Sequence, residues 1–260
     1  MEKSKVSKSG IPYLHFGSGE PLVLIHGLGE EKEGWENQYE LADHYEIIIP
    51  DLGGHGACNK SDGISIQNFA ADVTELLKEL GIESAHIAGF SMGGVVAQEI
   101  YRQAPDLCRS LLLVSTFHVC PKILRKIIYK SKKAKFEKLL STGGQGEYAA
   151  KLALYSWKEE NVNNFIKSFQ PKPHIFLSSL KACLNVDNSS LLPTVRVPTL
   201  VIGGQYDSIL PVQLQLWIHK LIPHSEFTIL RNTGHITKLE AKDRFNYLVR
   251  NFLNRQKMVV

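Results

Sequence analysis

Apolar residues in this chain occur as short runs, separated by longer stretches in which they recur every three to four positions. The short runs predict β-strands at residues 22–25, 46–49, 85–88, 111–114, 199–202 and 227–230. Val6 and residues 11–16 flank Ser9 and Gly10 and predict a hairpin that opens the fold. Most of these strands are apolar on both faces and alternate with helical stretches. We therefore expect an α/β fold whose mainly parallel sheet is flanked by helices.

The clearest helical stretch lies between the strands at 46–49 and 85–88. Ser65 is a suitable N-cap, apolar residues then follow the 3.6-residue period to Leu80, and Gly81 ends the pattern. Further helices are predicted at residues 92–103 and 240–254.

Residues 119–193 break this alternation, because they have helical periodicity and no clear strand. Helices are predicted there at 122–140, 148–158 and 174–185, between Pro121 and Pro193. The chain is therefore predicted to form a core from residues 1–118 and 194–260, with residues 119–193 inserted as a helical cap.

Composition is that of an ordinary globular protein, with 260 residues, 43% hydrophobic and 22% charged. The net charge of +4 is too small to indicate nucleic-acid binding, and no basic segment is interleaved with stacking aromatics. The four cysteines include no Cys-x-x-Cys pair, which favours reduced thiols and no metal site. No secretory signal or membrane-length apolar run is visible, so a cytoplasmic location is expected.

Candidate chemistry begins at residues 89–93, which read Gly-Phe-Ser-Met-Gly between a predicted strand and a predicted helix. A turn this tight forces its central residue into strained backbone angles and leaves no room for side chains two positions away. Glycine fills both flanking positions, and Ser91 would stand clear at a helix N-terminus. Ser91 is therefore predicted to be a nucleophile.

A serine hydroxyl needs a base at neutral pH. His235 follows the last predicted strand, and Asp207 follows the strand before it. The chain order Ser, Asp, His, with each residue at a strand end, predicts a catalytic triad in which Asp207 orients His235.

The tetrahedral intermediate of such a triad needs amide donors for its oxyanion. The amides of Met92, directly after the nucleophile, and of Leu28, in the loop after the strand at 22–25, are the candidates. A catalytic role for His26 is the rival hypothesis, but a role in holding this loop is favoured. Asp51 and His55 form a second acid–histidine pair, for which a structural role in a glycine-rich loop is favoured.

Together these motifs resemble the α/β-hydrolase superfamily, most closely small carboxylesterases and enol-lactone hydrolases. The residues that carry the resemblance are residues 26–29, Trp35, Gln38, Leu41, Ala42, residues 50–56, residues 89–94, residues 198–203, Asp207, Pro211, Gly234, His235, Glu240 and Phe245. It covers nearly all of the chain outside 119–193. Gly53 stands where such proteins often have Arg, and Ala57 and Cys58 also depart from the pattern. Ser91 in place of Asp argues against haloalkane dehalogenases and epoxide hydrolases.

The cap carries 13 Lys and Arg residues and 5 Asp and Glu residues, a net charge of +8, and eight of the basic residues fall within 122–138. Three interpretations stay open: solvated surface lysines, attraction of an anionic substrate, and weak contact with an anionic membrane surface. Phe90, His118, Trp157 and Phe176 are the candidate substrate-binding residues.

The sequence thus predicts a serine hydrolase that cleaves a small ester, thioester or lactone through an acyl-enzyme on Ser91, with no metal or organic cofactor. Alternatives on the same triad are a carbon–carbon bond hydrolase or a perhydrolase. A hydrolase-like ligand receptor with slow turnover is the alternative from another class. The pattern does not indicate the oligomeric state.

Overall fold

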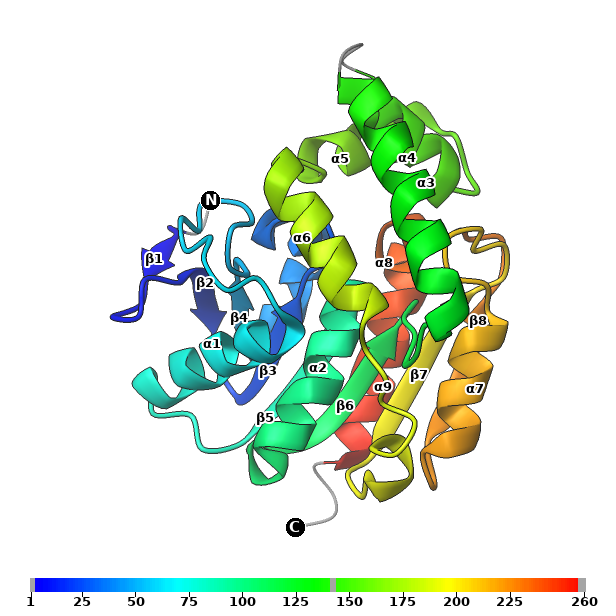
Figure 1. Ribbon diagram of the computed structural model, residues 1–260. Helices are drawn as coiled ribbons and strands as arrows, with labels where there is room; N and C mark the ends of the chain where they lie inside the picture. The colour runs from blue at the N-terminus through cyan, green and yellow to red at the C-terminus, as the bar shows by residue number, and fades with distance from the viewer. Residues whose placement is uncertain (1–2, 141–143, 257–260) are drawn as a thin grey trace.

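The computed structural model describes residues 3–140 and 144–256 (Figure 1). In these residues eight strands form one sheet in the order β1-β2-β4-β3-β5-β6-β7-β8. The strands are β1 (Lys5–Val6), β2 (Pro12–Gly17), β3 (Glu20–Ile25), β4 (Tyr45–Pro50), β5 (Ala85–Phe90), β6 (Cys108–Val114), β7 (Thr199–Gly204) and β8 (Glu226–Leu230). Two pairings are antiparallel: β1 with β2, which form the predicted hairpin, and β2 with β4. The other pairings are parallel. The predicted mainly parallel sheet is confirmed.

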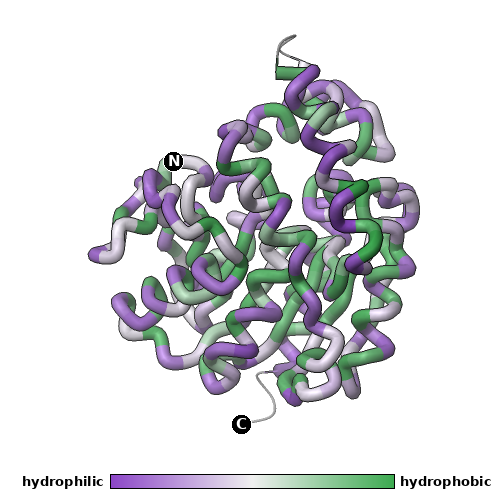
Figure 2. Tube along the Cα trace, in the orientation of Figure 1, coloured by the Kyte–Doolittle hydropathy of each residue, from purple (hydrophilic) through white to green (hydrophobic). Residues whose placement is uncertain are grey.

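Helices cover both faces of this sheet. Their bounds are η1 (Lys32–Asp43), α1 (Ile66–Glu79), α2 (Met92–Gln103), η2 (Pro105–Leu107), η3 (Leu192–Thr194), α7 (Gln213–Leu221), α8 (Thr237–Glu240) and α9 (Lys242–Gln256). Alternate residues of the strands face opposite sides. Val23 and Ile25 pack in the cluster that includes α1, α2 and α7. Leu22 and Leu24 pack in the cluster that includes η1 and α9. Figure 2 shows the resulting concentration of hydrophobic residues along the strands.

Helix α1 begins and ends where the sequence predicts. The Ser65 hydroxyl accepts a hydrogen bond from the Asn68 amide at 3.1 Å, which satisfies one of the free donors of the first turn. Gly81 has a φ of +73°, a left-handed conformation that ends a helix at little cost for glycine. The helices η1 and α7 were not predicted, because η1 is largely polar and α7 has only two buried residues.

In the described residues, four α-helices precede η3 between β6 and β7, at the end of the sheet where the parallel strands terminate (Figure 1). They are α3 (Lys122–Leu140), α4 (Gln145–Ala153), α5 (Glu159–Ser168) and α6 (Pro173–Leu184). Among the described residues of this segment, none belongs to a strand of the sheet. No helix in the described ranges is long and apolar enough to cross a membrane.

The predicted helix at 148–158 is wrong beyond Ala153. The Glu240 carboxylate accepts the amides of Tyr155 at 2.8 Å and Ser156 at 2.7 Å, which gives this stretch partners outside any helix. The chain then re-enters a helix at α5, which the sequence pattern did not indicate as a separate element.

Candidate active site

Ser91 occupies the turn between β5 and α2, with φ 52° and ψ −116°. A side chain at either flanking glycine would collide with backbone. A Cβ at Gly89 would lie 2.1 Å from the Gly93 carbonyl oxygen, and one at Gly93 would lie 2.2 Å from that of Ile25. The strained turn is fastened to the neighbouring strand, because the Ser91 amide donates to the Val114 carbonyl at 2.9 Å. The local sequence therefore dictates that the Ser91 side chain projects from the turn between β5 and α2.

The fold brings Ser91, His235 and Asp207 into one hydrogen-bonded chain. His235 Nε2 lies 3.0 Å from Ser91 Oγ, and His235 Nδ1 lies 2.7 Å from Asp207 Oδ2. The Asp207 side chain is completely buried and that of His235 is 5% exposed. The three residues follow β5, β7 and β8, whose carboxyl ends meet at one edge of the sheet.

The second oxygen of Asp207 is also satisfied. Asp207 Oδ1 accepts the amides of Ile209 at 2.9 Å and Leu210 at 2.8 Å. With four lone-pair sites on a buried carboxylate, these bonds fix the direction in which Oδ2 faces the imidazole.

The two predicted oxyanion donors, Leu28 and Met92, belong to different segments, the loop after β3 and the start of α2. Leu28 lines the same pocket as Ser91, and Met92 is the first residue of α2. First-turn amides of a helix have no intrahelical partner, so that of Met92 is free to bind an anion. Within residues 3–140 and 144–256 the Leu28 amide also makes no hydrogen bond to the protein. Both amides are therefore open to bind an oxyanion.

His26 holds the loop that carries Leu28. Its Nε2 accepts the Leu52 amide at 3.0 Å, and its Nδ1 donates to the Gly27 carbonyl at 2.8 Å. Burial lowers the pKa of His26, which keeps the ring neutral and suited to accept from an amide. With both ring nitrogens engaged, His26 is not placed to act on a substrate.

Asp51 and His55 bind backbone and lysine groups rather than each other. Asp51 accepts the amides of Lys32 at 2.8 Å and Ala57 at 3.0 Å, and it pairs with the Lys32 ammonium at 2.9 Å. His55 Nδ1 lies 3.0 Å from the Gly53 carbonyl. These contacts fix the loop after β4.

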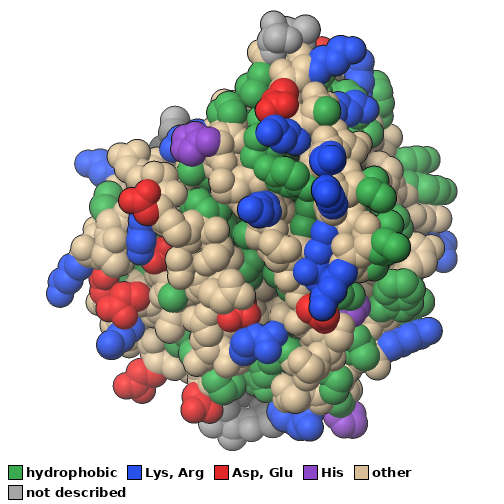
Figure 3. Space-filling view, viewed as in Figure 1, with side chains coloured by type: hydrophobic (Ala, Val, Ile, Leu, Met, Phe, Trp, Pro, Cys, Tyr) green, Lys and Arg blue, Asp and Glu red, His purple; other side chains and the backbone are tan. Residues whose placement is uncertain are grey.

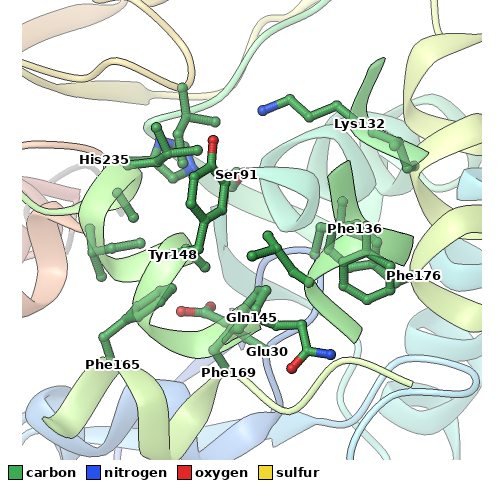
Figure 4. Close-up of a pocket in the computed structure, with 18 of the residues that line it drawn as sticks. Glu30, Ser91, Lys132, Phe136, Gln145, Tyr148, Phe165, Phe169, Phe176 and His235 are labelled. Atoms are coloured by element: carbon green, nitrogen blue, oxygen red, sulfur yellow. Dashed lines mark hydrogen bonds between the residues drawn. The ribbon is translucent and has the colours of Figure 1, made fainter. Parts of the chain in front are cut away.

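A largely apolar pocket opens above Ser91 and His235 (Figure 4). Most of its walls come from α3–α6, and its other lining residues include Leu28, Glu30, Phe90, Ile209 and Ile236. In Figure 4 the Tyr148 side chain reaches from α4 toward Ser91. Two exposed lysines of α3, Lys132 and Lys135, also line the pocket. The arrangement fits a substrate with an apolar group.

Of the four predicted substrate-binding residues, Phe90 and Phe176 line this pocket. The prediction for Trp157 is wrong: its side chain is 59% exposed, because it lies in the stretch between α4 and α5 that is not helical. His118 is not among the lining residues either. It is buried just after β6, where its carbonyl accepts the Asn188 amide at 2.8 Å and burial lowers the pKa of its ring.

A family model described as "alpha/beta hydrolase fold" matches residues 20–242. The chain belongs to the α/β-hydrolase fold family. The match spans the elbow, the strand-end acid and the histidine loop, so the predicted resemblance to this superfamily is confirmed.

In the described residues, no group of three or more His, Cys, Asp or Glu side chains is arranged to hold a metal ion.

Two relatives that match most of the chain are named as hydrolases. The chain is 28% identical to a putative carbamate hydrolase, RutD, of Azorhizobium caulinodans, covering 91% of this chain and 92% of that one. It is 30% identical to a 2-hydroxy-6-oxononadienedioate/2-hydroxy-6-oxononatrienedioate hydrolase of a Pseudomonas species, covering 92% and 90%. A thermophilic esterase of Thermogutta terrifontis has the same fold, with a TM-score of 0.86, 24% identity, and 98% and 99% coverage.

Three charged residues around this α/β-hydrolase site have contacts that the sequence did not reveal: Glu240, which the family pattern includes without a role, and Glu30 and Lys238, which the pattern does not include. Glu240 accepts the Gly234 amide at 2.7 Å and so joins the histidine loop to residues 155 and 156 of the cap. Burial raises the pKa of this carboxyl group. Glu30 and Lys238 form a buried ion pair at 3.2 Å, although they are 208 positions apart in the chain. Periodicity cannot reveal such a pair, because each residue alone resembles a surface charge.

Proposed function

We propose that this α/β-hydrolase is a serine hydrolase that cleaves a carboxylic ester, thioester or lactone through an acyl-enzyme on Ser91. The observation that carries the proposal is the hydrogen-bonded chain from Ser91 Oγ through His235 to Asp207, at 3.0 and 2.7 Å. Nucleophile, base and orienting acid lie within direct hydrogen-bonding distance, as a serine triad requires.

In acylation, Ser91 Oγ attacks the substrate carbonyl while His235 Nε2 takes the hydroxyl proton. The amides of Leu28 and Met92 bind the oxyanion of the tetrahedral intermediate, and each such donor contributes about 3–4 kcal/mol to lowering the barrier. His235 then gives its proton to the leaving group, on the oxygen of an alcohol or the sulfur of a thiol, and the acyl group stays on Ser91.

In deacylation, His235 takes a proton from water, and the resulting hydroxide attacks the acyl carbonyl. The second tetrahedral intermediate collapses, the proton returns to Ser91 Oγ, and the carboxylic acid leaves. The His235–Asp207 contact stabilises the imidazolium in both halves of the reaction.

The cap supports a small substrate with an apolar acyl or alcohol group. Residues 119–193 act in this proposal as a lid, since Phe136, Phe169 and Phe176 line the pocket from helices of that segment or directly beside them. The pocket encloses about 210 Å³, which suits a small molecule better than a polymer. Lys132 and Lys135 favour an anionic group on the part of the substrate nearest α3.

The cysteines support a reducing, cytoplasmic environment as part of the proposal. Cys58, Cys108, Cys120 and Cys183 are all free and buried. Burial raises the pKa of Cys108 and Cys183 to about 12, so their thiols stay protonated and unreactive.

A carbon–carbon bond hydrolase is the second candidate, favoured by the 30% identical Pseudomonas relative. A single experiment separates the two. Purified protein is assayed on p-nitrophenyl esters of graded acyl length and on a vinylogous 1,5-diketone of matched size, with Ser91→Ala as the background. The proposal expects repeated turnover of esters; turnover of the diketone alone would establish the second candidate. A single slow turnover with a conformational change would instead indicate a ligand receptor.

A further inference from the structure

Lys238 contacts or adjoins three segments of the site: the oxyanion loop of residues 27–30, the turn that carries Ser91 and the loop that carries His235. Its side chain is only 2% exposed. Its ammonium is 3.2 Å from Glu30 Oε1 and also donates to the Gly34 carbonyl. The Glu30 side chain is 3% exposed. Lys238 belongs to α8, which begins two residues after His235, whereas Glu30 and Gly34 follow the strand that leads to Leu28.

The same ammonium also contacts the nucleophile turn. It lies 4.9 Å from the ring centroid of Phe90, the residue before Ser91, and 4.9 Å from that of Trp35. The Phe90 ring in turn packs on the His235 ring, with centroids 5.0 Å apart. A cation held between two aromatic faces and a carboxylate has little freedom to move.

Glu30 connects the Lys238 ammonium to the oxyanion loop. Its second oxygen, Oε2, accepts the Gly27 amide at 3.0 Å, one residue before the Leu28 amide. The loop is packed tightly against the nucleophile turn, because a Cβ at Gly27 would lie 2.9 Å from the Phe90 ring. On its other side, the Gly29 carbonyl accepts the Gln170 amide of the cap at 2.9 Å.

Stability alone gives a weak account of this pair. Desolvating two charges commonly costs as much as their attraction returns, so buried ion pairs add little net stability. A buried pair does fix distances, however, since any displacement leaves a charge without a partner. The pair here fixes the distance between the oxyanion loop and the segments that carry Ser91 and His235.

We propose that Lys238 and Glu30 are positioning residues that hold the Leu28 amide in register with Ser91 and His235. The inference rests on the proposed serine-hydrolase function, because the register matters only if an oxyanion forms there. Neither side chain touches the reacting atoms; both act through the loop of residues 27–30.

The test replaces Lys238 with Met, which keeps most of the length of the unbranched side chain and removes the charge. Lys32→Met is the matched control, because Lys32 is also buried and paired with a carboxylate, Asp51, outside the catalytic groups. For each variant kcat and KM are measured per active site, titrated with a fluorophosphonate, together with the thermal midpoint. A trifluoromethyl ketone, which forms an oxyanion on the serine, supplies a second readout.

We expect Lys238→Met to lower kcat by about 10- to 100-fold and to change KM less than about 3-fold. A displaced Leu28 amide would lose part of its hydrogen bond to the oxyanion, which raises the barrier without weakening substrate binding. Affinity for the trifluoromethyl ketone should fall by a similar factor. Lys32→Met should lower the thermal midpoint and leave kcat per titrated site near the wild-type value.

Glu30→Gln and the double variant Glu30→Gln with Lys238→Met guard against simple misfolding. The double variant leaves no unpaired buried charge, so its thermal midpoint should recover, while its kcat should stay low. Recovery of kcat together with the midpoint, or an unchanged kcat in Lys238→Met, would overturn the inference. Failure of the serine-hydrolase proposal looks different: wild type itself would be inactive and would not be labelled.

Discussion

The His235 imidazole has one arrangement of protons that satisfies both neighbours. A buried carboxylate only accepts hydrogen bonds, so Nδ1 must carry the proton toward Asp207 at 2.7 Å. Nε2 is then the acceptor for the Ser91 hydroxyl at 3.0 Å. Asp207 therefore selects the tautomer that can act as a base.

Asp207→Asn should test that selection. An amide keeps the shape of the carboxylate, but it loses the charge that stabilises the imidazolium and can hold the ring in the wrong tautomer. We expect kcat to fall by about 10⁴-fold, as in a related triad, with the fold retained.

Asp51→Asn provides the comparison, because Asp51 is also fully buried but supports a loop. Its loss should lower the free energy of unfolding by about 1–3 kcal/mol and leave most of kcat. Both quantities are measured for both variants. A near wild-type kcat in Asp207→Asn beside an inactive, stable Asp51→Asn would reverse the roles.

His55 predicts how stability depends on pH. Burial, followed by the nearby His26, lowers the pKa of His55 in the folded protein to about 3, against 6.5 for a free histidine. Between these values the unfolded chain binds the proton and the folded chain does not, so stability is lost as the pH falls through this window.

Replacing His55 with Gln should flatten this dependence. The free energy of unfolding of His55→Gln, measured by urea titration between about pH 6 and pH 4, should depend less steeply on pH than that of wild type. The difference in slope should be up to about 1.4 kcal/mol per pH unit, the value for one proton. Equal slopes in the two proteins would show that His55 is protonated in the folded state.

At the scale of elements, α3 combines a basic surface with a wall of the pocket. Lys and Arg side chains gather along this helix in the space-filling view (Figure 3). Lys135 lies over the Tyr148 ring at 4.2 Å, whereas in the described residues Lys132 forms no ion pair. In Figure 4 the Lys132 ammonium points across the pocket.

Lys132→Gln should therefore change substrate choice. For an ester whose acyl group ends in a carboxylate, KM should rise about 3- to 10-fold, and the rise should shrink at high salt. A neutral ester of equal length should be unaffected. Lys126→Gln, an exposed lysine of the same helix outside the pocket lining, is the control. Equal effects of both variants on both esters would leave α3 as a solvated surface.

Elements that follow from local patterns were predictable, and those that depend on distant partners were not. Ser65 and Gly81 mark the ends of α1 by themselves, and Gly89 and Gly93 mark the nucleophile turn. The break after α4 depends instead on Glu240, which lies 85 positions from Tyr155. Trp157 follows that break and is exposed, so it does not line the pocket as the sequence predicted.

The whole molecule explains why the catalytic order could be inferred. Parallel strands end at the same edge of a sheet, so residues that follow β5, β7 and β8 must come together there. The sequence alone therefore predicts Ser91, Asp207 and His235 as a group. It does not predict Glu30 and Lys238, because their meeting depends on how η1 and α8 pack on one face of the finished sheet.

Labelling with a fluorophosphonate, followed by peptide mass spectrometry, identifies the serine that acts as the nucleophile. The reagent phosphonylates a serine only where a base and an oxyanion site activate it. We expect one adduct, on the peptide that contains Ser91, and no labelling in Ser91→Ala. An adduct on Ser115 or another serine, or no adduct on protein shown to be folded, would contradict it.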